Sequence, residues 1–293
     1  MSNRALEPVA SASPRPGVAG CAALRWEKGL LGPAHERVVL EEPLAIEIGY
    51  TKAGQRVRRV LAVTMRTPGD EEDLATGFLY GEGLIGSADE VVSGQLLSEN
   101  SRGERIPTWC AVLSAPPPAD GVERVSRGVI TSAACGLCGR TSLRGLRAPA
   151  RPDGPPPAPI TGAAVLALAS GLARLQEIYP ETGGCHGAGL FDASGEPLLV
   201  REDVGRHNAV DKVVGAALRR DIDMRGASLV LSGRAGFELI QKAAAAGVAL
   251  VVSVGAPSSL AVQMARDASL TLAGFTRSGK FNVYSVAGRG IEA

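Results

Sequence analysis

The chain has 293 residues, of which 45% are hydrophobic and 21% are charged, and this composition is that of a globular protein with one large domain or two lobes. The formal net charge of +1 provides no overall field that would recruit nucleic acid or a membrane surface, and no basic run supplies a local one. We therefore expect neither a nucleic-acid partner nor a membrane partner.

The first segment, residues 1–35, has no apolar core of signal-peptide length, and prolines interrupt it. We predict a disordered tail there and, because no export signal is visible, a cytoplasmic protein. The longest apolar stretch, 243–257, is too short to cross a bilayer. In the cytoplasm the five cysteines stay mostly reduced, and their odd number argues against a disulfide framework.

Residues 36–147 are predicted to form an N-terminal, antiparallel β-rich lobe with one helix and a cysteine loop. Strands are predicted at 36–48, 55–64, 95–97, 108–113 and 121–125. The first two alternate apolar and polar residues around Gly54, which is typical of a paired hairpin. Asp70 is placed to cap a helix with an acidic first turn, and Gly81 and Gly83 end that helix.

The cysteine loop contains Cys135 and Cys138 in the stretch SAACGLCGR, whose small residues leave no room for a regular packed element. Two thiols three positions apart could share a metal, form a redox pair or carry a sulfur atom. A thioredoxin-type motif should open a helix beside a strand, and Gly136 and Gly139 disfavour a helix here.

Residues 148–159 (APARPDGPPPAP) are rich in proline, which predicts a stiff linker or a long surface loop. The remaining residues, 160–293, alternate helices and strands. Helices are predicted at 161–178, 208–220, 235–246 and 259–267, and strands at 228–231, 249–254, 270–275 and 281–286. The βαβαβ order implies parallel strands, so we predict an α/β lobe that binds a nucleotide or cofactor. Pro180 is expected to stop the first helix, and Asn208 to cap the second.

Ligands of open α/β sheets bind beyond the carboxyl ends of the strands. Here Ser232, Gly233 and Arg234 follow one predicted strand and residues 256–259 follow the next, each group opening a helix. Free N–H groups at a helix start and a guanidinium group suit phosphate. Helix caps use the same residue types, so each exit alone leaves both interpretations open.

The stretch GFTRSGKF, 274–281, nearly matches the phosphate loop G-x-x-x-x-G-K-[ST]. Phe281 replaces the magnesium-binding hydroxyl residue, and a strand rather than a helix follows, so we reject a P-loop ATPase. Arg277, Ser278 and Lys280 could still contact phosphates. The alternative is a β-hairpin turn with solvated charges.

Two further clusters leave alternatives open. In REDVGRHNAVDK, 201–212, polar residues crowd a strand-to-helix corner, either as a capping network or as a site that includes His207. In TGGCHGAGL, Cys185 and His186 could complete a zinc site with the cysteine loop, although adjacent residues rarely bind one ion. A zinc deaminase is excluded, because Ala188 replaces the catalytic glutamate of its H-x-E signature.

Together these motifs resemble one family, the formate dehydrogenase accessory sulfurtransferases (FdhD). The resemblance rests on RTPGDEEDLATGFLYGEGLI, SAACGLCG, TGGCHGAGL, REDVGRHNAVDKVVG, LVLSGRAGFELIQKAA, VSVGAPSSLAV and GFTRSGKFNVY, which occur in this order. It implies a cytidine deaminase-like αβα core beside the β-rich lobe, usually in a homodimer. The tail and the proline-rich insert fall outside it.

The resemblance also implies a function. Proteins of this family take persulfide sulfur from a cysteine desulfurase and pass it to the bis-guanine-dinucleotide molybdenum cofactor before this enters the catalytic subunit of formate dehydrogenase. Cys135 matches the persulfide-bearing cysteine, and Cys138 is the second cysteine of the loop. The turn 275–280 matches the stretch assigned to cofactor binding, where guanine nucleotide could substitute for the cofactor.

The residues that we expect to bind the cofactor are Phe275, Thr276, Arg277, Ser278, Gly279, Lys280, Ser232, Gly233, Arg234 and His207. No metal ligand is assigned. The alternative function is a zinc-stabilised nucleotide-binding module without transfer chemistry.

Overall fold

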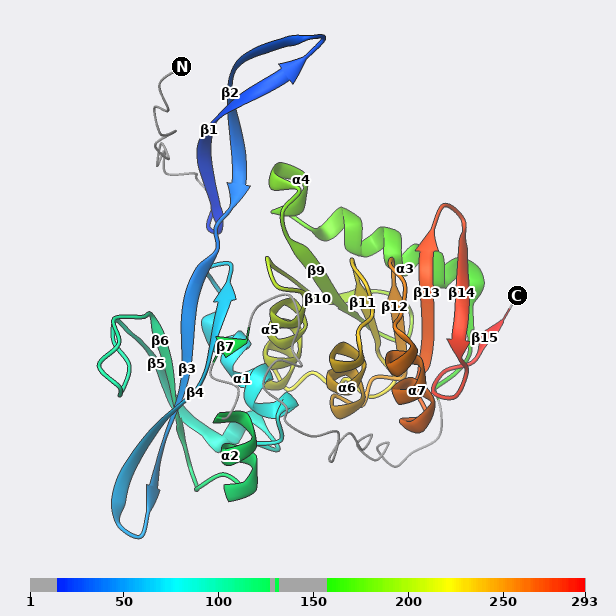
Figure 1. Cartoon of the computed structure of the whole chain (residues 1–293). Helices are drawn as coiled ribbons and strands as arrows, with labels where there is room; N and C mark the ends of the chain where they lie inside the picture. Colours follow the sequence, from blue (N-terminus) through cyan, green and yellow to red (C-terminus); the bar gives the residue numbers. More distant parts are fainter. Residues whose placement is uncertain (1–14, 127–129, 132–156, 293) are drawn as a thin grey trace.

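The computed structural model describes residues 15–126, 130–131 and 157–292, which form a long N-terminal hairpin, a five-stranded sheet and a six-stranded sheet (Figure 1). Cys135, Cys138 and most of the proline-rich stretch lie outside the described residues, as do residues 1–14. No helix in the described part of the chain is long and apolar enough to cross a membrane.

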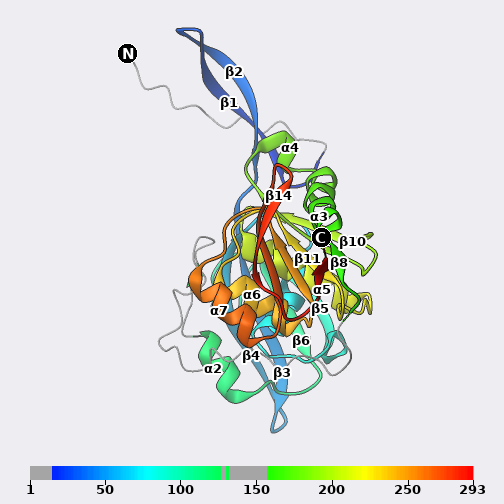
Figure 2. The ribbon, with the colours of Figure 1, turned by 90° about the vertical axis from the view of Figure 1, so that its right-hand side faces the viewer.

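The N-terminal hairpin corrects the expectation of a disordered tail over 1–35. β1 (Val18–Glu27) and β2 (Leu30–Val39) pair antiparallel along their whole length. Lys28 and Gly29 form the two-residue turn with φ angles of 51° and 84°, as a hairpin turn that matches the strand twist requires. The hairpin projects from the rest of the molecule, and its strand β2 contacts α4 (Tyr179–Thr182) (Figures 1 and 2).

The five-stranded sheet has the order β5-β6-β3-β4-β7. Its strands are β3 (Glu42–Lys52), β4 (Gln55–Arg66), β5 (Val91–Leu97), β6 (Thr108–Leu113) and β7 (Ile130–Thr131), and the short turn η1 (Ala88–Glu90) precedes β5. β3 and β4 form the predicted antiparallel hairpin. β6 joins β3 in parallel and β7 joins β4 in parallel, so this sheet is mixed rather than antiparallel.

Two helices belong to this lobe. α1 (Glu71–Gly81) begins after Asp70 as predicted, but Asp70 has a φ of 57° and its side chain makes no cap hydrogen bond. α2 (Ala119–Ser126) replaces the strand that was predicted at 121–125. Val122 and Val125 are three positions apart, so a helix places both against the core of the sheet, and this packing overrides their preference for strands.

The six-stranded sheet has the order β10-β9-β11-β12-β13-β14. Its strands are β9 (His186–Phe191), β10 (Pro197–Asp203), β11 (Ser228–Leu231), β12 (Leu250–Ser253), β13 (Thr271–Arg277) and β14 (Lys280–Ser285). The central strands β11, β12 and β13 run parallel, as the βαβαβ order predicted. β9 and β14 flank them in antiparallel orientation. Outside this sheet, β8 (Ile160–Thr161) pairs with β15 (Ile291–Glu292).

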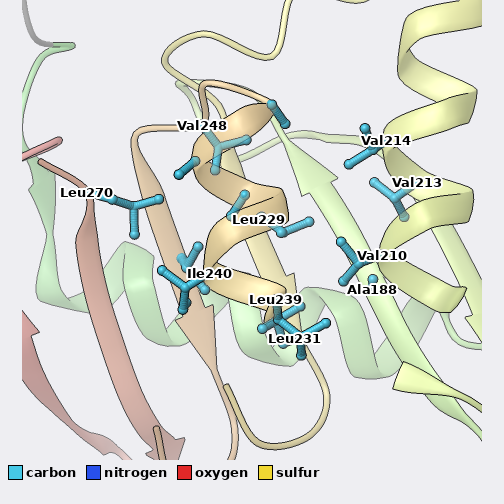
Figure 3. Packing of buried hydrophobic residues seen from close by; sticks show 14 of the residues in the cluster. Ala188, Val210, Val213, Val214, Leu229, Leu231, Leu239, Ile240, Val248 and Leu270 are labelled. Atoms are coloured by element: carbon cyan, nitrogen blue, oxygen red, sulfur yellow. The ribbon is translucent and has the colours of Figure 1, made fainter. Parts of the chain in front are cut away.

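Helices cover both faces of the six-stranded sheet. They are α3 (Gly162–Leu175) on one face and α5 (Arg206–Arg219), α6 (Phe237–Ala245) and α7 (Ser259–Asp267) on the other. Successive side chains of β11 point to opposite faces of the sheet. Leu229 and Leu231 therefore join the core under α5 and α6, and Val230 joins the core under α3. Figure 3 shows Val210 and Ile240 pointing from their helices into the first of these cores. The predicted αβα layering is present, and its likeness to cytidine deaminases stays a prediction.

Two predicted helix ends in this lobe are wrong. α3 ends at Leu175, and Pro180 lies inside α4, where a proline is tolerated in the first turn. α5 begins at Arg206 after the N-cap Gly205, so Asn208 lies within the helix and does not cap it. The Asn208 amide instead reaches the β-rich lobe, where its Nδ2 donates to the carbonyl of Met65 over 2.8 Å.

α1 and α5 join the two lobes at a crossing with very close backbones. A Cβ atom on Gly77 would overlap the backbone carbonyl oxygen of Asp211, and a Cβ atom on Gly215 would overlap that of Asp73. Only glycine permits this approach at both positions. The β-rich lobe and the αβα core are therefore packed backbone against backbone.

Candidate functional site

The predicted phosphate-binding residues lie where the parallel strands end. Ser232, Gly233 and Arg234 follow β11, and Gly255 follows β12 two residues after its end at Ser253. Gly255 donates its N–H to the carbonyl of Gly233 over 2.9 Å, and Ser253 Oγ donates to the same carbonyl over 2.7 Å. A Cβ atom at position 255 would be 2.8 Å from that oxygen, so this junction requires glycine.

The turn 275–280 reaches the same edge from β13. The N–H of Phe275 donates to the carbonyl of Gly255 over 3.0 Å. Phe275 has a φ of 55°, and the pairing of β13 with β14 shifts between Gly274 and Arg277, so the strand bulges at this point. The two stretches that were predicted from separate strand ends are thus linked through Gly255. We call this region the carboxyl edge.

Three exposed cations at the carboxyl edge have no carboxylate partner among the described residues: Arg234, Arg277 and Lys280. The Arg277 guanidinium carbon lies 5.9 Å from the ring centroid of Phe275, close enough for a cation–π contact that steadies it. Arg234 stands one position before Ala235, which bridges to Pro257 of the next strand exit. The edge therefore presents positive charge that the described protein leaves unneutralised.

A buried hydroxyl lies between these cations in sequence. Thr276 is 2% exposed, and its Oγ1 has no hydrogen-bond partner within the described structure. Leaving such a group unpaired costs on the order of 1–3 kcal/mol, so a ligand atom that pairs with it would gain that free energy. The turn therefore contains a buried polar atom whose partner is not among the described residues.

The helix that follows β11 begins without a side-chain cap. Gly236, the N-cap of α6, has no side chain that could accept a hydrogen bond from the first turn. The start of α7 differs, because Ser258 Oγ accepts the N–H of Ala261 over 3.2 Å. The helix dipole alone would favour an anion at the start of α6, but Glu238 already places a carboxylate in that first turn.

A cavity of about 370 Å³ opens beside the ends of β11 and β12. Its lining residues are Ala169, Leu172, Ala173, Gln176, Tyr179, Gly183, Gly184, Cys185, His186, Ser232 and Val254. The His186 ring packs against the backbone of Gly233, since a Cβ atom there would be 3.0 Å from Nδ1. Burial and the charge of Arg206 lower the pKa of His186, so its imidazole is neutral at pH 7.

Cys185 is a buried thiol that is hydrogen-bonded to a carboxylate. It is 5% exposed, and its Sγ donates to Glu202 Oε1 over 3.2 Å. Burial and the Glu202 carboxylate raise the pKa of Cys185 far above its usual range. Within the described residues no group of three His, Cys, Asp or Glu is placed to hold a metal ion. These residues therefore give no support to the zinc-stabilised module.

The corner 201–212 forms a network of ion pairs and hydrogen bonds that joins neighbouring elements. His207 lies on the first turn of α5, and its Nε2 is 3.0 Å from Glu238 Oε2 on α6. The buried pair of Asp203 and Lys212 lies behind it, with a distance of 2.9 Å between Oδ2 and Nζ. The role of His207 in cofactor binding stays a prediction.

Gly255 is the residue at the carboxyl edge that sequence reasoning missed. It links the exits of β11, β12 and β13 through two backbone hydrogen bonds. A signal was present, since a glycine that ends a predicted parallel strand marks a close backbone approach. Gln176 and Tyr179, which line the cavity, gave no signal, because Gln176 is the C-cap of α3 and Tyr179 begins the four-residue helix α4, which was not predicted.

The sequence model of the FdhD/NarQ family matches residues 39–291. Similar relatives include the sulfur carrier protein FdhD of Nocardia farcinica, 46% identical over 258 residues that cover 87% of this chain and 88% of the relative. The sulfur carrier protein FdhD of Mycobacterium tuberculosis is 40% identical over 260 residues, covering 87% and 91%. A solved structure described as a formate dehydrogenase accessory protein from Desulfotalea psychrophila has a similar fold, with a TM-score of 0.66 at 23% identity over 92% of this chain and 98% of that one. The chain therefore belongs to the FdhD/NarQ family.

Proposed function

We propose that this chain is a sulfur carrier in the maturation of formate dehydrogenase. It accepts sulfane sulfur from a cysteine desulfurase on Cys135 and delivers it to the molybdenum of a bis-guanine-dinucleotide cofactor, which then enters the catalytic subunit. Family membership supports the role as a sulfur carrier, because the similar relatives are named sulfur carrier proteins. The unneutralised carboxyl edge supports the binding of the cofactor. The resemblance also predicts a homodimer, which light scattering of the purified chain would test.

The three described cysteines are poorly suited to carry a persulfide, which favours Cys135 and Cys138 as the carriers. Cys110 and Cys185 are buried, and burial raises the pKa of both thiols. Cys21 is half-buried in β1, and its Sγ donates to the carbonyl of the next residue over 3.4 Å. Persulfide transfer needs an accessible thiolate, which leaves the two cysteines outside the described residues as the better candidates.

The proposed loading step is an exchange between a thiolate and a persulfide. The Cys135 thiolate attacks the outer sulfur of the donor persulfide, the S–S bond of the donor breaks, and the donor cysteine leaves as a thiolate. Cys135 then carries S–S–H, and atoms and charge balance without an oxidant. The flanking Gly136 and Gly139 leave room for a bulky donor.

The cofactor is the substrate of this reaction, and the carboxyl edge has the chemistry to hold its nucleotide ends. Pyrophosphate groups are anionic and suit the guanidinium groups of Arg234 and Arg277 and the ammonium group of Lys280. The unpaired Thr276 Oγ1 supplies a donor or an acceptor at the same turn.

Mass spectrometry of the loaded protein tests the carrier step. The full chain is incubated with a cysteine desulfurase and cysteine, and the peptide that contains Cys135 should gain the mass of one sulfur atom. Cys135→Ala should lose the adduct and Cys21→Ala should keep it. An adduct that stays in Cys135→Ala, or that sits on another cysteine of the wild type, would contradict the assignment.

A further inference from the structure

The β3–β4 hairpin concentrates positive charge that the net charge of the chain conceals. Residues 48–69 contain five basic residues and no Asp or Glu, whereas the whole chain has a formal net charge of +1. The four nearest the tip have exposed side chains, and we call them the basic arm: Lys52, Arg56, Arg58 and Arg59. They are not consecutive in sequence, so no basic run announces them. The pairing of β3 with β4 brings them together.

The arm lies on a projecting two-stranded ribbon. β6 pairs with β3 only as far as Gly49, which lies opposite Arg58, so no third described strand supports the tip. The ribbon points away from the molecule at the end opposite to the β13–β14 turn (Figures 1 and 2). A bare ribbon of this kind gains little stability by itself, so its length and charge point to a partner outside the chain.

One charge of the arm is paired at its base, and the other three are not neutralised by any described residue. The Arg58 guanidinium lies 2.6 Å from Glu47 Oε2, and the Glu47 side chain is fully buried, which anchors the base of the arm. Lys52, Arg56 and Arg59 form no ion pair with any described residue. Like charges at this spacing repel one another, and an acidic partner surface would relieve that repulsion.

We propose that the basic arm docks an acidic surface of the protein that donates the persulfide sulfur, an inference that rests on the proposed function. Position favours the donor over the recipient of the sulfur. Thr131 of β7, the last described residue before the stretch that contains Cys135, pairs with Thr64 on β4, the strand that carries three of the four arm residues. The carboxyl edge, which is proposed to hold the sulfur acceptor, belongs to the other sheet.

A nucleic acid fits the arm less well than an acidic protein does. Sites that bind single strands without sequence preference combine a basic groove with aromatic side chains on which the bases stack. Tyr50 is the one aromatic residue in the segment 48–69, and it is half-buried. Electrostatic docking of a protein partner needs no such platform.

The experiment compares two sulfur sources for the same chain. In the arm variant, Lys52, Arg56 and Arg59 are each changed to Glu. In a matched control, three exposed cations elsewhere, Lys28, Arg174 and Arg220, receive the same change. The rate at which Cys135 gains sulfur is measured with a cysteine desulfurase and, separately, with a small-molecule persulfide that needs no docking.

We expect the arm variant to load about tenfold or more slowly from the desulfurase at low ionic strength, because steering by charge raises association rates by about 10–10³-fold. The difference should shrink at high salt, where the screening length falls to about 3 Å. Loading from the small persulfide should be unchanged, and the control variant should behave as the wild type with both donors.

The other outcomes are distinguishable. If the arm variant loads at the wild-type rate from the desulfurase, the docking proposal is wrong and the proposed function stands. If the wild type takes sulfur from neither donor, the proposed function itself fails. The arm variant could load normally and yet lose binding to the formate dehydrogenase catalytic subunit, or to a single-stranded RNA that the wild type binds. Either result would reassign the arm to that partner and overturn the donor assignment.

Discussion

Two stretches of this chain are similarly polar in sequence and differ in the structure. In 201–212, at the start of α5, the buried side chains of Asp203, Asn208 and Lys212 are paired with other protein atoms. In 274–281, at the β13–β14 turn, Arg277 and Lys280 are exposed without a carboxylate partner among the described residues, and Thr276 Oγ1 is buried without a hydrogen bond. The density of polar residues is therefore a poor guide to a binding site, and their state of pairing is a better one.

The first stretch works as a clamp between the lobes. Asp203 accepts the N–H of Gly205 over 2.8 Å and that of Thr67 over 3.1 Å, and it pairs with Lys212 at 2.9 Å. Lys212 also donates to the carbonyl of Thr67 over 2.9 Å. Because Thr67 follows β4, these bonds tie the end of the five-stranded sheet to α5. We call this group the interlobe clamp.

The largest effect should come from breaking the interlobe clamp. Asp203→Ala and Lys212→Ala each leave a buried charge without its partner, which costs about 3–5 kcal/mol of folding free energy. Thermal or denaturant unfolding of the purified variants measures this loss. Lys280→Ala at the carboxyl edge is the control and should unfold like the wild type. Equal destabilisation by Lys280→Ala would erase the contrast between the two stretches.

The next effect concerns the helix crossing that supports the clamp. Gly77→Ala and Gly215→Ala would push a methyl group into a backbone carbonyl, and we expect a loss of at least about 1–3 kcal/mol in the free energy of unfolding. Gly32→Ala is the matched control, because a Cβ atom there meets nothing within 4 Å. Denaturant unfolding should separate the two classes. Wild-type stability in Gly77→Ala would show that α1 and α5 can separate freely.

The carboxyl edge should respond in binding and not in folding. Arg277→Ala and Lys280→Ala each remove a charged donor, and a hydrogen bond to a charged group is worth about 1.5–3 kcal/mol, so we expect guanine nucleotide to bind about tenfold or more weakly. Calorimetric titration with GDP measures the affinity, and the melting temperature should stay unchanged. Arg220→Ala serves as the control at an exposed cation elsewhere. If both variants bind GDP with the affinity of the wild type, the nucleotide does not bind at this turn.

The smallest effect is the pH dependence of stability at Cys185. Burial and Glu202 raise the pKa of this thiol in the folded protein, whereas an unfolded cysteine titrates near about 8.5. The folded state then holds more protons, so this stabilisation is complete below about pH 8.5 and declines as the pH rises above that value, by up to about 1.4 kcal/mol per pH unit. Cys185→Ala should flatten the decline between neutral and alkaline pH in denaturant unfolding. An identical slope in the variant would show that the thiol ionises normally.

Sequence reasoning was most accurate where a pattern was long and local packing agreed with it. β6, β11 and α7 have the predicted bounds, and the parallel order of β11, β12 and β13 follows from alternating helices and strands. In the fully buried sheet core each apolar residue has a helix to pack against on either face. Local pattern and tertiary contact therefore indicate the same structure.

The misses have physical causes too. Val122 and Val125 have a strand preference that the packing of α2 overrode. The β1–β2 hairpin was missed. Its strand β2 contains Pro33, and a proline within a strand is tolerated only at a sheet edge. Asn208 has the chemistry of a helix cap, but the capping position belongs to Gly205. The predicted binding roles of the ten site residues stay predictions, although the strand ends did bring 232–234 and 275–280 to one edge.

The glycine crossing of α1 and α5 limits movement between the two lobes. Contacts between backbones contain no side-chain rotamers that could adjust, so the crossing leaves little slack for hinge or shear movement between the lobes. The cores of the two lobes then keep nearly the same relative position. If the chain carries sulfur as proposed, the sulfur atom itself has to move from one lobe to the other, because the lobes do not approach each other.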